Sequence, residues 1–428
     1  MNSINAIHFS SAVPYAILSG STILTSWLMS ELAVLRNHEE ADTPNGWTVV
    51  AATHVLTAVT FGAAYSFSAV FPGLAAEFGA SRGETALVFS ISAFLFYSLG
   101  AIAGPLADKW SPRWLVLLGL GAMILGYIGA SRAGSLLSLY IWYGFGVGFG
   151  IGLSYVPALG AVQSWFIRKR SQASGIATAG LGLGTLILPF AVGQALPSIG
   201  WRGCFVALAC VFAILGLPAA MFIRKRRENA RLPSAEESGN ANPLAIWRDS
   251  RFRLFYIVLI LSSFCTFIPY VHIVAAAKDM GLSIQDGTAL VGLIGIGNVI
   301  GRFFLAGLGD RLGRRRLLAA LTFAVAGSFA IWASASGMIQ LALFALTFGM
   351  SYGGCVGLYP AVAADLFGTR QISAVIGYLY TAVGIAALIG PTAAGFIFDR
   401  TGSYFGPIVA SGVAAFIAGF IALRLGRK

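Results

Sequence analysis

Two short polar stretches decide the fold of this chain, Gly307-Leu-Gly-Asp310-Arg-Leu-Gly-Arg-Arg-Arg316 and Gly104-Pro-Leu-Ala-Asp108-Lys-Trp-Ser-Pro-Arg113. Each follows a long apolar run, and their aspartates are 202 residues apart. The same offset of 202 residues separates two further pairs, Gly175 from Gly377 and Pro189 from Pro391. Three pairs in different segments with one offset indicate an internal duplication, which is common in membrane transporters.

Composition sets the class of the protein. Of 428 residues, 57% are hydrophobic and 10% are charged, whereas soluble domains carry about 25% charged residues. The apolar runs are roughly 20 residues long, which suffices to cross about 30 Å of hydrocarbon as a helix. A closed barrel, the other structure that spans a membrane, needs alternating polarity instead. We therefore predict an all-α membrane protein.

The duplication and the apolar runs predict twelve transmembrane helices in two pseudo-symmetric six-helix bundles. We expect an N-terminal bundle over 46–223, a polar cytoplasmic linker over 224–251, and a C-terminal bundle with a short tail over 252–428. The predicted spans are 47–71, 84–107, 114–131, 134–164, 172–196, 201–223, 254–277, 286–308, 317–335, 338–364, 372–397 and 404–425.

Residues 1–45 form an N-terminal extension of unknown structure. Its apolar run over 11–35 is interrupted by Pro14 and Glu31. It could be a signal-like segment, a thirteenth helix or a plain extension. No Lys or Arg precedes the run, which disfavours a cleaved signal peptide.

Basic residues orient the helices. If the first span starts in the cytoplasm, 21 of the 28 Lys and Arg residues fall on the cytoplasmic side. Five fall outside, namely Arg82, Arg132, Arg202, Lys278 and Arg400. This is the positive-inside pattern, and it predicts a protein of the inner or plasma membrane, with both ends of the twelve-helix core cytoplasmic. The net charge of +12 thus requires no nucleic acid partner.

The two polar stretches lie at the cytoplasmic ends of the second helix of each half. Carboxylates and basic residues in such turns can pair with each other and with helix ends. We predict that they hold neighbouring helices in one conformation as a latch. Its residues are Asp108, Arg113, Asp310, Arg311 and Arg314.

Arg302 is the most informative single residue. It lies eight residues before Asp310, about 12 Å along a helix and hence near the bilayer midplane. A charge there costs at least about 2.5–3.5 kcal/mol, so it should face a cavity and meet an anion. A guanidinium can bind a carboxylate through two parallel hydrogen bonds. Asn298, one turn earlier on the same face, can hold the guanidinium or the substrate.

Hydroxyl groups within the predicted spans are candidates for the remaining substrate contacts. They belong to Tyr65, Tyr155, Tyr352 and Tyr359. Two histidines, His54 and His272, are candidates for proton coupling because imidazole titrates near neutral pH. Each tyrosine could equally be an interface or packing residue, and a lone histidine in a membrane is more often a hydrogen-bonded structural residue.

The sequence predicts no enzyme, metal site or cofactor. The four cysteines, Cys204, Cys210, Cys265 and Cys355, lie within predicted spans without metal-ligand spacing. No cluster of His, Cys, Ser or carboxylates has catalytic spacing within the spans. We expect lipid as the surroundings, a small organic anion and protons as ligands, and function as a monomer.

Several motifs resemble one known family. The segment 307–316 is similar to the loop signature of the major facilitator superfamily, Gly-x-Leu-x-Asp-Arg-x-Gly-Arg-Arg. Trp165-Phe-Ile-Arg-Lys-Arg-Ser-Gln-Ala-Ser-Gly-Ile-Ala-Thr-Ala-Gly180 resembles the fifth-helix signature of its monocarboxylate porter family. Asn45-Gly-Trp47 is similar to part of the first-helix signature, and Asn298-x-x-x-Arg302 to the eighth-helix Asp-x-x-x-Arg. The resemblance covers residues 45–425.

This resemblance implies an alternating-access carrier for lactate-like or pyruvate-like anions, coupled to protons, with Arg302 as the carboxylate anchor. The chain departs from the family pattern at two positions, because Asn298 replaces an Asp and Ala69 stands where the family has a Lys. The related oxalate:formate antiporters have a Lys in the eleventh helix, and the span 372–397 has none. Such anion exchange, drug efflux and carboxylate sensing remain alternatives.

Overall fold

The computed structural model describes residues 44–166, 170–226, 243–367 and 372–425. Within these ranges every regular element is a helix, which confirms the all-α class. The apolar run over residues 11–35 and the middle of the predicted linker lie outside the described residues.

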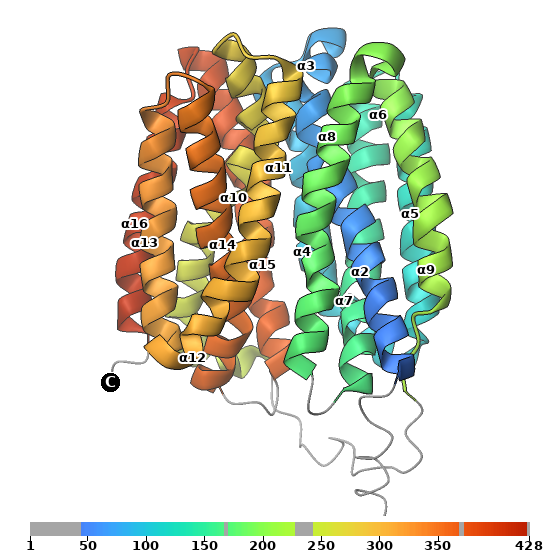
Figure 1. The fold of residues 1–428 in the computed structure, drawn as a ribbon, viewed down its shortest axis with the longest axis vertical. Helices are drawn as coiled ribbons and strands as arrows, with labels where there is room; N and C mark the ends of the chain where they lie inside the picture. Colours follow the sequence, from blue (N-terminus) through green and yellow to red (C-terminus); the bar gives the residue numbers. More distant parts are fainter. Residues whose placement is uncertain (1–43, 167–169, 227–242, 368–371, 426–428) are drawn as a thin grey trace, which may run out of the picture.

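Two groups of helices stand side by side in Figure 1. The first consists of α2 (Pro44–Tyr65), α3 (Phe67–Phe78), α4 (Arg82–Lys109), α5 (Pro112–Ser131), α6 (Leu136–Leu139), η1 (Tyr140–Phe145), α7 (Gly146–Trp165), α8 (Arg170–Val211), η2 (Phe212–Gly216) and α9 (Leu217–Met221). The second consists of η4 (Pro243–Arg248), α10 (Ser250–Asp279), α11 (Ile284–Ile300), η5 (Gly301–Leu305), η6 (Ala306–Leu308), α12 (Gly309–Leu312), α13 (Arg314–Ala333), α14 (Met338–Phe367), α15 (Ile372–Thr401) and α16 (Phe405–Arg424).

Eleven stretches of the described residues are long and apolar enough to span a membrane. One of them, Ala173–Met221, has 49 residues, more than twice the roughly 20 residues of a single crossing. Gly200 interrupts it with φ 64° and ψ 175°, a conformation that favours glycine. Counting this stretch as two crossings would give twelve, so the number twelve stays a prediction.

The duplication extends to the way two helices begin. Ser81 accepts a hydrogen bond from the backbone N–H of Glu84, and the Glu84 carboxylate accepts one from Ser81 N–H, which forms a capping box at the start of α4. Ser283 and Asp286 form the same capping box at the start of α11. Both pairs are related by the offset of 202 residues. Each box satisfies N–H groups that the first helical turn leaves without partners.

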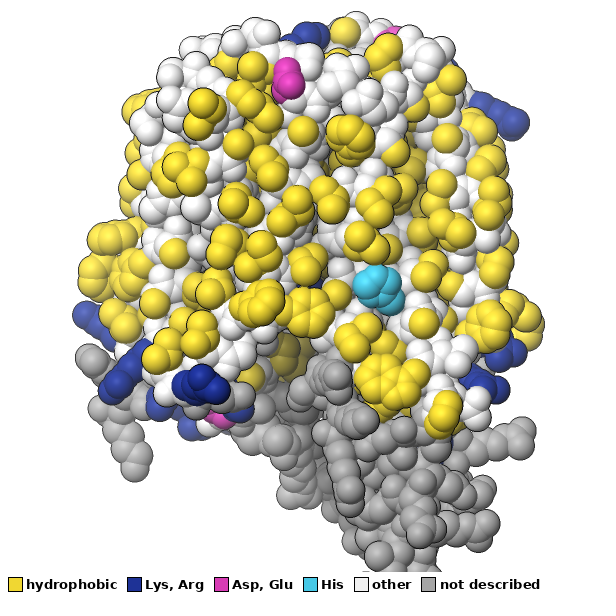
Figure 2. Space-filling view, viewed as in Figure 1, with side chains coloured by type: hydrophobic (Ala, Val, Ile, Leu, Met, Phe, Trp, Pro, Cys, Tyr) yellow, Lys and Arg dark blue, Asp and Glu magenta, His cyan; other side chains and the backbone are white. Residues whose placement is uncertain are grey.

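The lateral face of the molecule is largely hydrophobic, as a surface against lipid requires. In Figure 2 hydrophobic side chains cover this face, and most of the visible Lys and Arg side chains lie at its lower end. We call this the basic end; α2 and α13 begin there, and α4 begins at the opposite end (Figure 1). Ile339 and Phe304 show how exposed the apolar surface is, with 83% and 70% of their surface accessible.

Two pairs of helices make contacts between the two groups. Helix α4 packs against α15, and α8 packs against α11. The second contact is close because it is made by glycines: a Cβ at Gly295 would lie 2.8 Å from the carbonyl oxygen of Gly182. Small residues allow such a close approach of helix backbones in a membrane.

Candidate functional site

A cavity lies between the two groups of helices. Both groups contribute to its wall. The lining residues are Phe61 and Tyr65 of α2, Tyr97 of α4, Tyr155 of α7, Leu181 of α8, Ser263 of α10, Arg302 of η5, Tyr352, Val356 and Tyr359 of α14, and Tyr380 and Val383 of α15.

Arg302 lies in η5, a single turn of π-helix that follows α11. Such turns occur frequently at functional sites. The residue is half-buried, and its Nε donates a hydrogen bond to Oδ1 of Asn298 at 3.1 Å. Gly301 allows η5 to approach α14, since a Cβ there would collide with the carbonyl oxygen of Met350. The bond through Nε leaves both terminal nitrogens of the guanidinium for a ligand.

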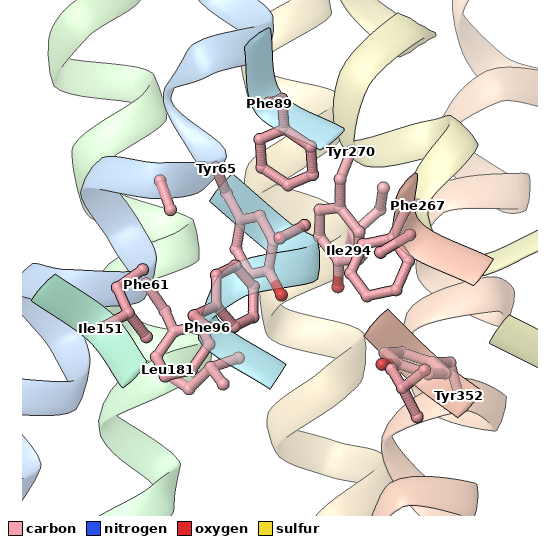
Figure 3. Packing of buried hydrophobic residues seen from close by; sticks show 14 of the residues in the cluster. Phe61, Tyr65, Phe89, Phe96, Ile151, Leu181, Phe267, Tyr270, Ile294 and Tyr352 are labelled. Carbon is pink, nitrogen blue, oxygen red and sulfur yellow. The ribbon is translucent and has the colours of Figure 1, made fainter. Parts of the chain in front are cut away.

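Asn298 lies beside the cavity, where its side chain is 1% exposed. Its Nδ2 donates a hydrogen bond to the hydroxyl of Tyr270 at 3.0 Å. The ring of Tyr270 stacks on that of Tyr65, with centroids 4.2 Å apart and planes at 17°. Figure 3 shows these two rings face to face between α10 and α2. A chain of contacts therefore runs from Arg302 to the other group of helices.

All four tyrosines predicted from the sequence, Tyr65, Tyr155, Tyr352 and Tyr359, line this cavity. Their role in binding stays a prediction. Two more cavity tyrosines, Tyr97 and Tyr380, were missed. Their rings come from different groups of helices and contact each other edge to face, with centroids 6.0 Å apart. Both lie in the middle of predicted spans, so the criterion that selected the other four would also have found them.

Arg302 is the single charged side chain among the described residues that line the cavity. The other polar groups there are six tyrosine hydroxyls and the hydroxyl of Ser263. Charges interact more strongly where water and counter-charges are scarce. A cavity of this kind favours a small anion whose remaining surface is apolar or carries one or two hydrogen-bonding groups.

The cavity-lining residues include neither histidine proposed for proton coupling. His54 Nδ1 lies 2.7 Å from the carbonyl oxygen of Ile176. His272 is fully buried, with Nε2 at 2.8 Å from the carbonyl oxygen of Pro391 and Nδ1 at 2.9 Å from the hydroxyl of Tyr404. Since a carbonyl only accepts, Nε2 of His272 carries a hydrogen. The coupling role of both residues stays a prediction.

Contacts between the two groups continue from the cavity toward the opposite end. Beyond the pair of stacked tyrosines, Phe71 of α3 meets the ring of His272 edge to face at 5.2 Å. Further out, the Arg82 guanidinium lies 5.2 Å from the ring of Tyr404.

The predicted latch lies at the basic end. Arg314 pairs with Asp365 at 2.9 Å, which joins the start of α13 to the end of α14. Arg113 lies in the first turn of α5 and Arg311 in α12. The side chains of Asp108 and Asp310 lie outside the described part of the structure, so the proposed pairing of these aspartates stays a prediction.

Among the residues that the structure describes, no group of three or more His, Cys, Asp or Glu side chains could hold a metal ion. The four cysteines are free thiols, and Cys210 is exposed while the other three are buried.

The chain resembles known proteins in sequence and in fold. A family model described as Major Facilitator Superfamily matches residues 53–391 and 296–428. The human protein "Monocarboxylate transporter 11" is 27% identical over 400 residues, which cover 89% of this chain and 83% of that protein. "Monocarboxylate transporter 3" of Rattus norvegicus is 29% identical over 371 residues, or 84% and 75% of the two chains.

Two solved structures share the fold. One is a bacterial homolog of the human lysosomal transporter Spinster in an inward-facing, unoccupied conformation, with a TM-score of 0.69 at 16% identity, covering 91% of this chain and 100% of the other. The other is a nucleoside transporter, with a TM-score of 0.70 at 14% identity, covering 89% of this chain and 100% of the other. At these identities the likeness concerns the fold alone.

Proposed function

The chain belongs to the Major Facilitator Superfamily, and from this premise we propose that it carries a small organic monocarboxylate across the membrane by alternating access. Curated relatives named monocarboxylate transporters match 84–89% of the chain. These matches agree with the resemblance to the monocarboxylate porter family in the segment 165–180. The proposed cargo is a lactate-like or pyruvate-like acid.

One observation carries this proposal: Arg302 is the single charge among the described residues of the cavity wall. A cation without a counter-charge is costly inside a membrane. A carboxylate would neutralise it and could accept two parallel hydrogen bonds from its terminal nitrogens. One guanidinium balances one carboxylate, which favours a monocarboxylate over a dicarboxylate.

The remaining wall supports a short acid with one further polar group. Phe61, Leu181, Val356 and Val383 offer apolar contact. The hydroxyls of tyrosines from both groups of helices can donate to or accept from a keto or hydroxyl group next to the carboxylate. Because both groups supply contacts, a bound acid would draw them together around it.

Protons and orientation complete the proposal. We propose that the basic end faces the cytoplasm of the cell, as the distribution of Lys and Arg predicts, and that the carrier works as a monomer. Coupling to protons would use His54 or His272, since Asn298 stands where a protonatable carboxylate would otherwise contact Arg302. Neither histidine touches the cavity, so a proton at either would act on the substrate site through intervening residues.

The test is uptake of radiolabelled lactate and pyruvate into proteoliposomes, with and without an inward proton gradient. We expect Arg302→Ala to reduce uptake at least about 30-fold, since truncating one partner of a buried charged pair typically costs about 2–5 kcal/mol. Arg302→Lys keeps the charge but loses the planar fork, so its uptake should fall between the two. Arg132→Ala, in an exposed loop position, is the matched control and should transport normally.

Two results would contradict the proposal. One is folded wild-type protein that moves neither acid, and the other is normal transport by Arg302→Ala. Uptake that depends on Arg302 but does not respond to the proton gradient would support the proposed carrier and contradict the proposed proton coupling.

A further inference from the structure

Tyr270 does not line the cavity, yet it contacts the residue that orients Arg302. Its side chain is 1% exposed, and its ring lies between Tyr65, stacked at 4.2 Å, and Phe348, edge to face at 6.3 Å. Rings on two sides fix the position of the phenol. Its oxygen is therefore a fixed point at the edge of the site (Figure 3).

The hydrogen bonds around Asn298 are compatible with one orientation of its amide. Arg302 Nε can only donate, so it must face the amide oxygen, as it does at 3.1 Å. The amide nitrogen then points away from Arg302 and needs an acceptor, which the Tyr270 oxygen provides at 3.0 Å. A flipped amide would place N–H groups against the guanidinium. Arg302 thus sets the orientation of the amide, and Tyr270 accepts from the amide nitrogen in that orientation.

We propose that Tyr270 is a positioning residue for the carboxylate anchor. By accepting from Asn298 it fixes the amide, the amide fixes Nε of Arg302, and the two terminal nitrogens are thereby directed at the cavity. The inference rests on the proposed function for its transport readout. Because Tyr270 also stacks on Tyr65 of the other group of helices, the orientation of the anchor is tied to the contact between the groups.

The variant Tyr270→Phe tests the hydroxyl while keeping the ring and its stacking. It leaves the Asn298 amide nitrogen buried without its acceptor, which costs roughly 1–3 kcal/mol. We expect the KM for lactate to rise by about tenfold, equivalent to 1.4 kcal/mol, with Vmax changed less than about twofold because charge and cavity shape remain. Tyr143→Phe is the matched control: this buried tyrosine donates to the carbonyl oxygen of Ala64 and is not among the residues that line the cavity.

A double-mutant cycle with Asn298→Ala shows whether Tyr270 acts through Asn298. Asn298→Ala alone should raise KM at least as much as Tyr270→Phe. Adding Tyr270→Phe to Asn298→Ala should then change KM less than about twofold, because the hydrogen bond between residues 298 and 270 is already absent. If Tyr270→Phe raises KM equally in both backgrounds, the tyrosine acts elsewhere and the inference is wrong.

A second measurement needs no transported substrate. Phenylglyoxal modifies accessible guanidinium groups, and peptide mass spectrometry of the full-length protein can follow Arg302 alone. We expect Arg302 to react several-fold faster in Tyr270→Phe and in Asn298→Ala than in the wild type, and no faster in the double variant than in Asn298→Ala. Equal rates in all four proteins would overturn the inference. If the wild type moves no monocarboxylate, the proposed function fails while this experiment still decides the role of Tyr270.

Discussion

Arg82 of α4 and Asp279 of α10 form a bidentate ion pair that joins the two groups of helices at the end opposite the basic end. The two guanidinium nitrogens donate to the two carboxylate oxygens, each at 2.7 Å. The guanidinium also donates to the Tyr404 hydroxyl at 2.9 Å and lies 3.7 Å from the ring centroid of Phe398. This cluster joins the two groups of helices at that end, so separating them there requires these contacts to break.

Asp279→Asn should favour opening at that end. The pair is partly exposed, at 22% and 38% for the two side chains, so we assign it at most about 1 kcal/mol. That corresponds to an increase of up to about fivefold in the open population. The measurement is the alkylation rate of Ser263→Cys in the cavity by a membrane-impermeant maleimide applied from this end, in a background without the four native cysteines.

Arg202→Gln provides the matched control for that experiment. Arg202 of α8 pairs with Glu77 of α3, near the same end but within one group of helices. Its loss should leave the alkylation rate at Ser263→Cys unchanged. If Asp279→Asn and Arg202→Gln accelerate the alkylation equally, general loosening of the protein controls access to the cavity, and the contact between the groups does not.

Asp399→Ala should both destabilise the protein and favour opening. The Asp399 carboxylate of α15 accepts hydrogen bonds from the backbone N–H groups of Arg82 and Gly83, at 2.8 and 2.9 Å, and so caps α4 from the other group. Losing a cap costs about 0.5–2 kcal/mol, which thermal unfolding should detect. Glu84→Ala removes a cap within α4 itself, where Glu84 accepts from Ser81 N–H; it should lower the melting temperature without accelerating alkylation.

His272→Gln tests the predicted proton coupling. Glutamine can donate to one neighbour and accept from the other, as the neutral imidazole does toward Pro391 and Tyr404, but it cannot bind a proton. If His272 couples transport to protons, uptake should no longer respond to the gradient while exchange of labelled for unlabelled lactate continues. His54→Gln is the parallel variant. Full gradient dependence in both would remove both histidines as coupling groups.

Gly301→Ala should destabilise the protein because the new methyl group would collide with the Met350 carbonyl oxygen in α14. Overpacking of this kind typically costs about 1–3 kcal/mol. Gly307→Ala is the control, since nothing lies within 4 Å of the corresponding methyl position. Melting temperatures of the two purified variants check the prediction; a stable Gly301→Ala would show that η5 can move away from α14.

Much of the fold follows from local sequence patterns. Apolar runs of membrane-spanning length predicted the helices, although the boundaries moved. The first predicted span, 47–71, became Pro44–Phe78, which consists of α2 and α3. Where two spans were predicted, one long apolar helical stretch runs from Ala173 to Met221. Helix caps and glycine conformations shift such ends, and hydropathy does not register them.

The sequence by itself determined the membrane class, the side on which basic residues gather, the internal duplication and the proximity of Asn298 to Arg302, because each depends on composition or on neighbours within one turn. Only the tertiary structure decided that Tyr97 and Tyr380 share the cavity, that Tyr270 contacts Asn298, and that Arg82 reaches Asp279, 197 residues away. The distribution of Lys and Arg predicted only that Arg82 lies in an outer loop. Contacts between helices distant in sequence depend on how apolar faces pack and rotate against each other, and no local pattern encodes that rotation.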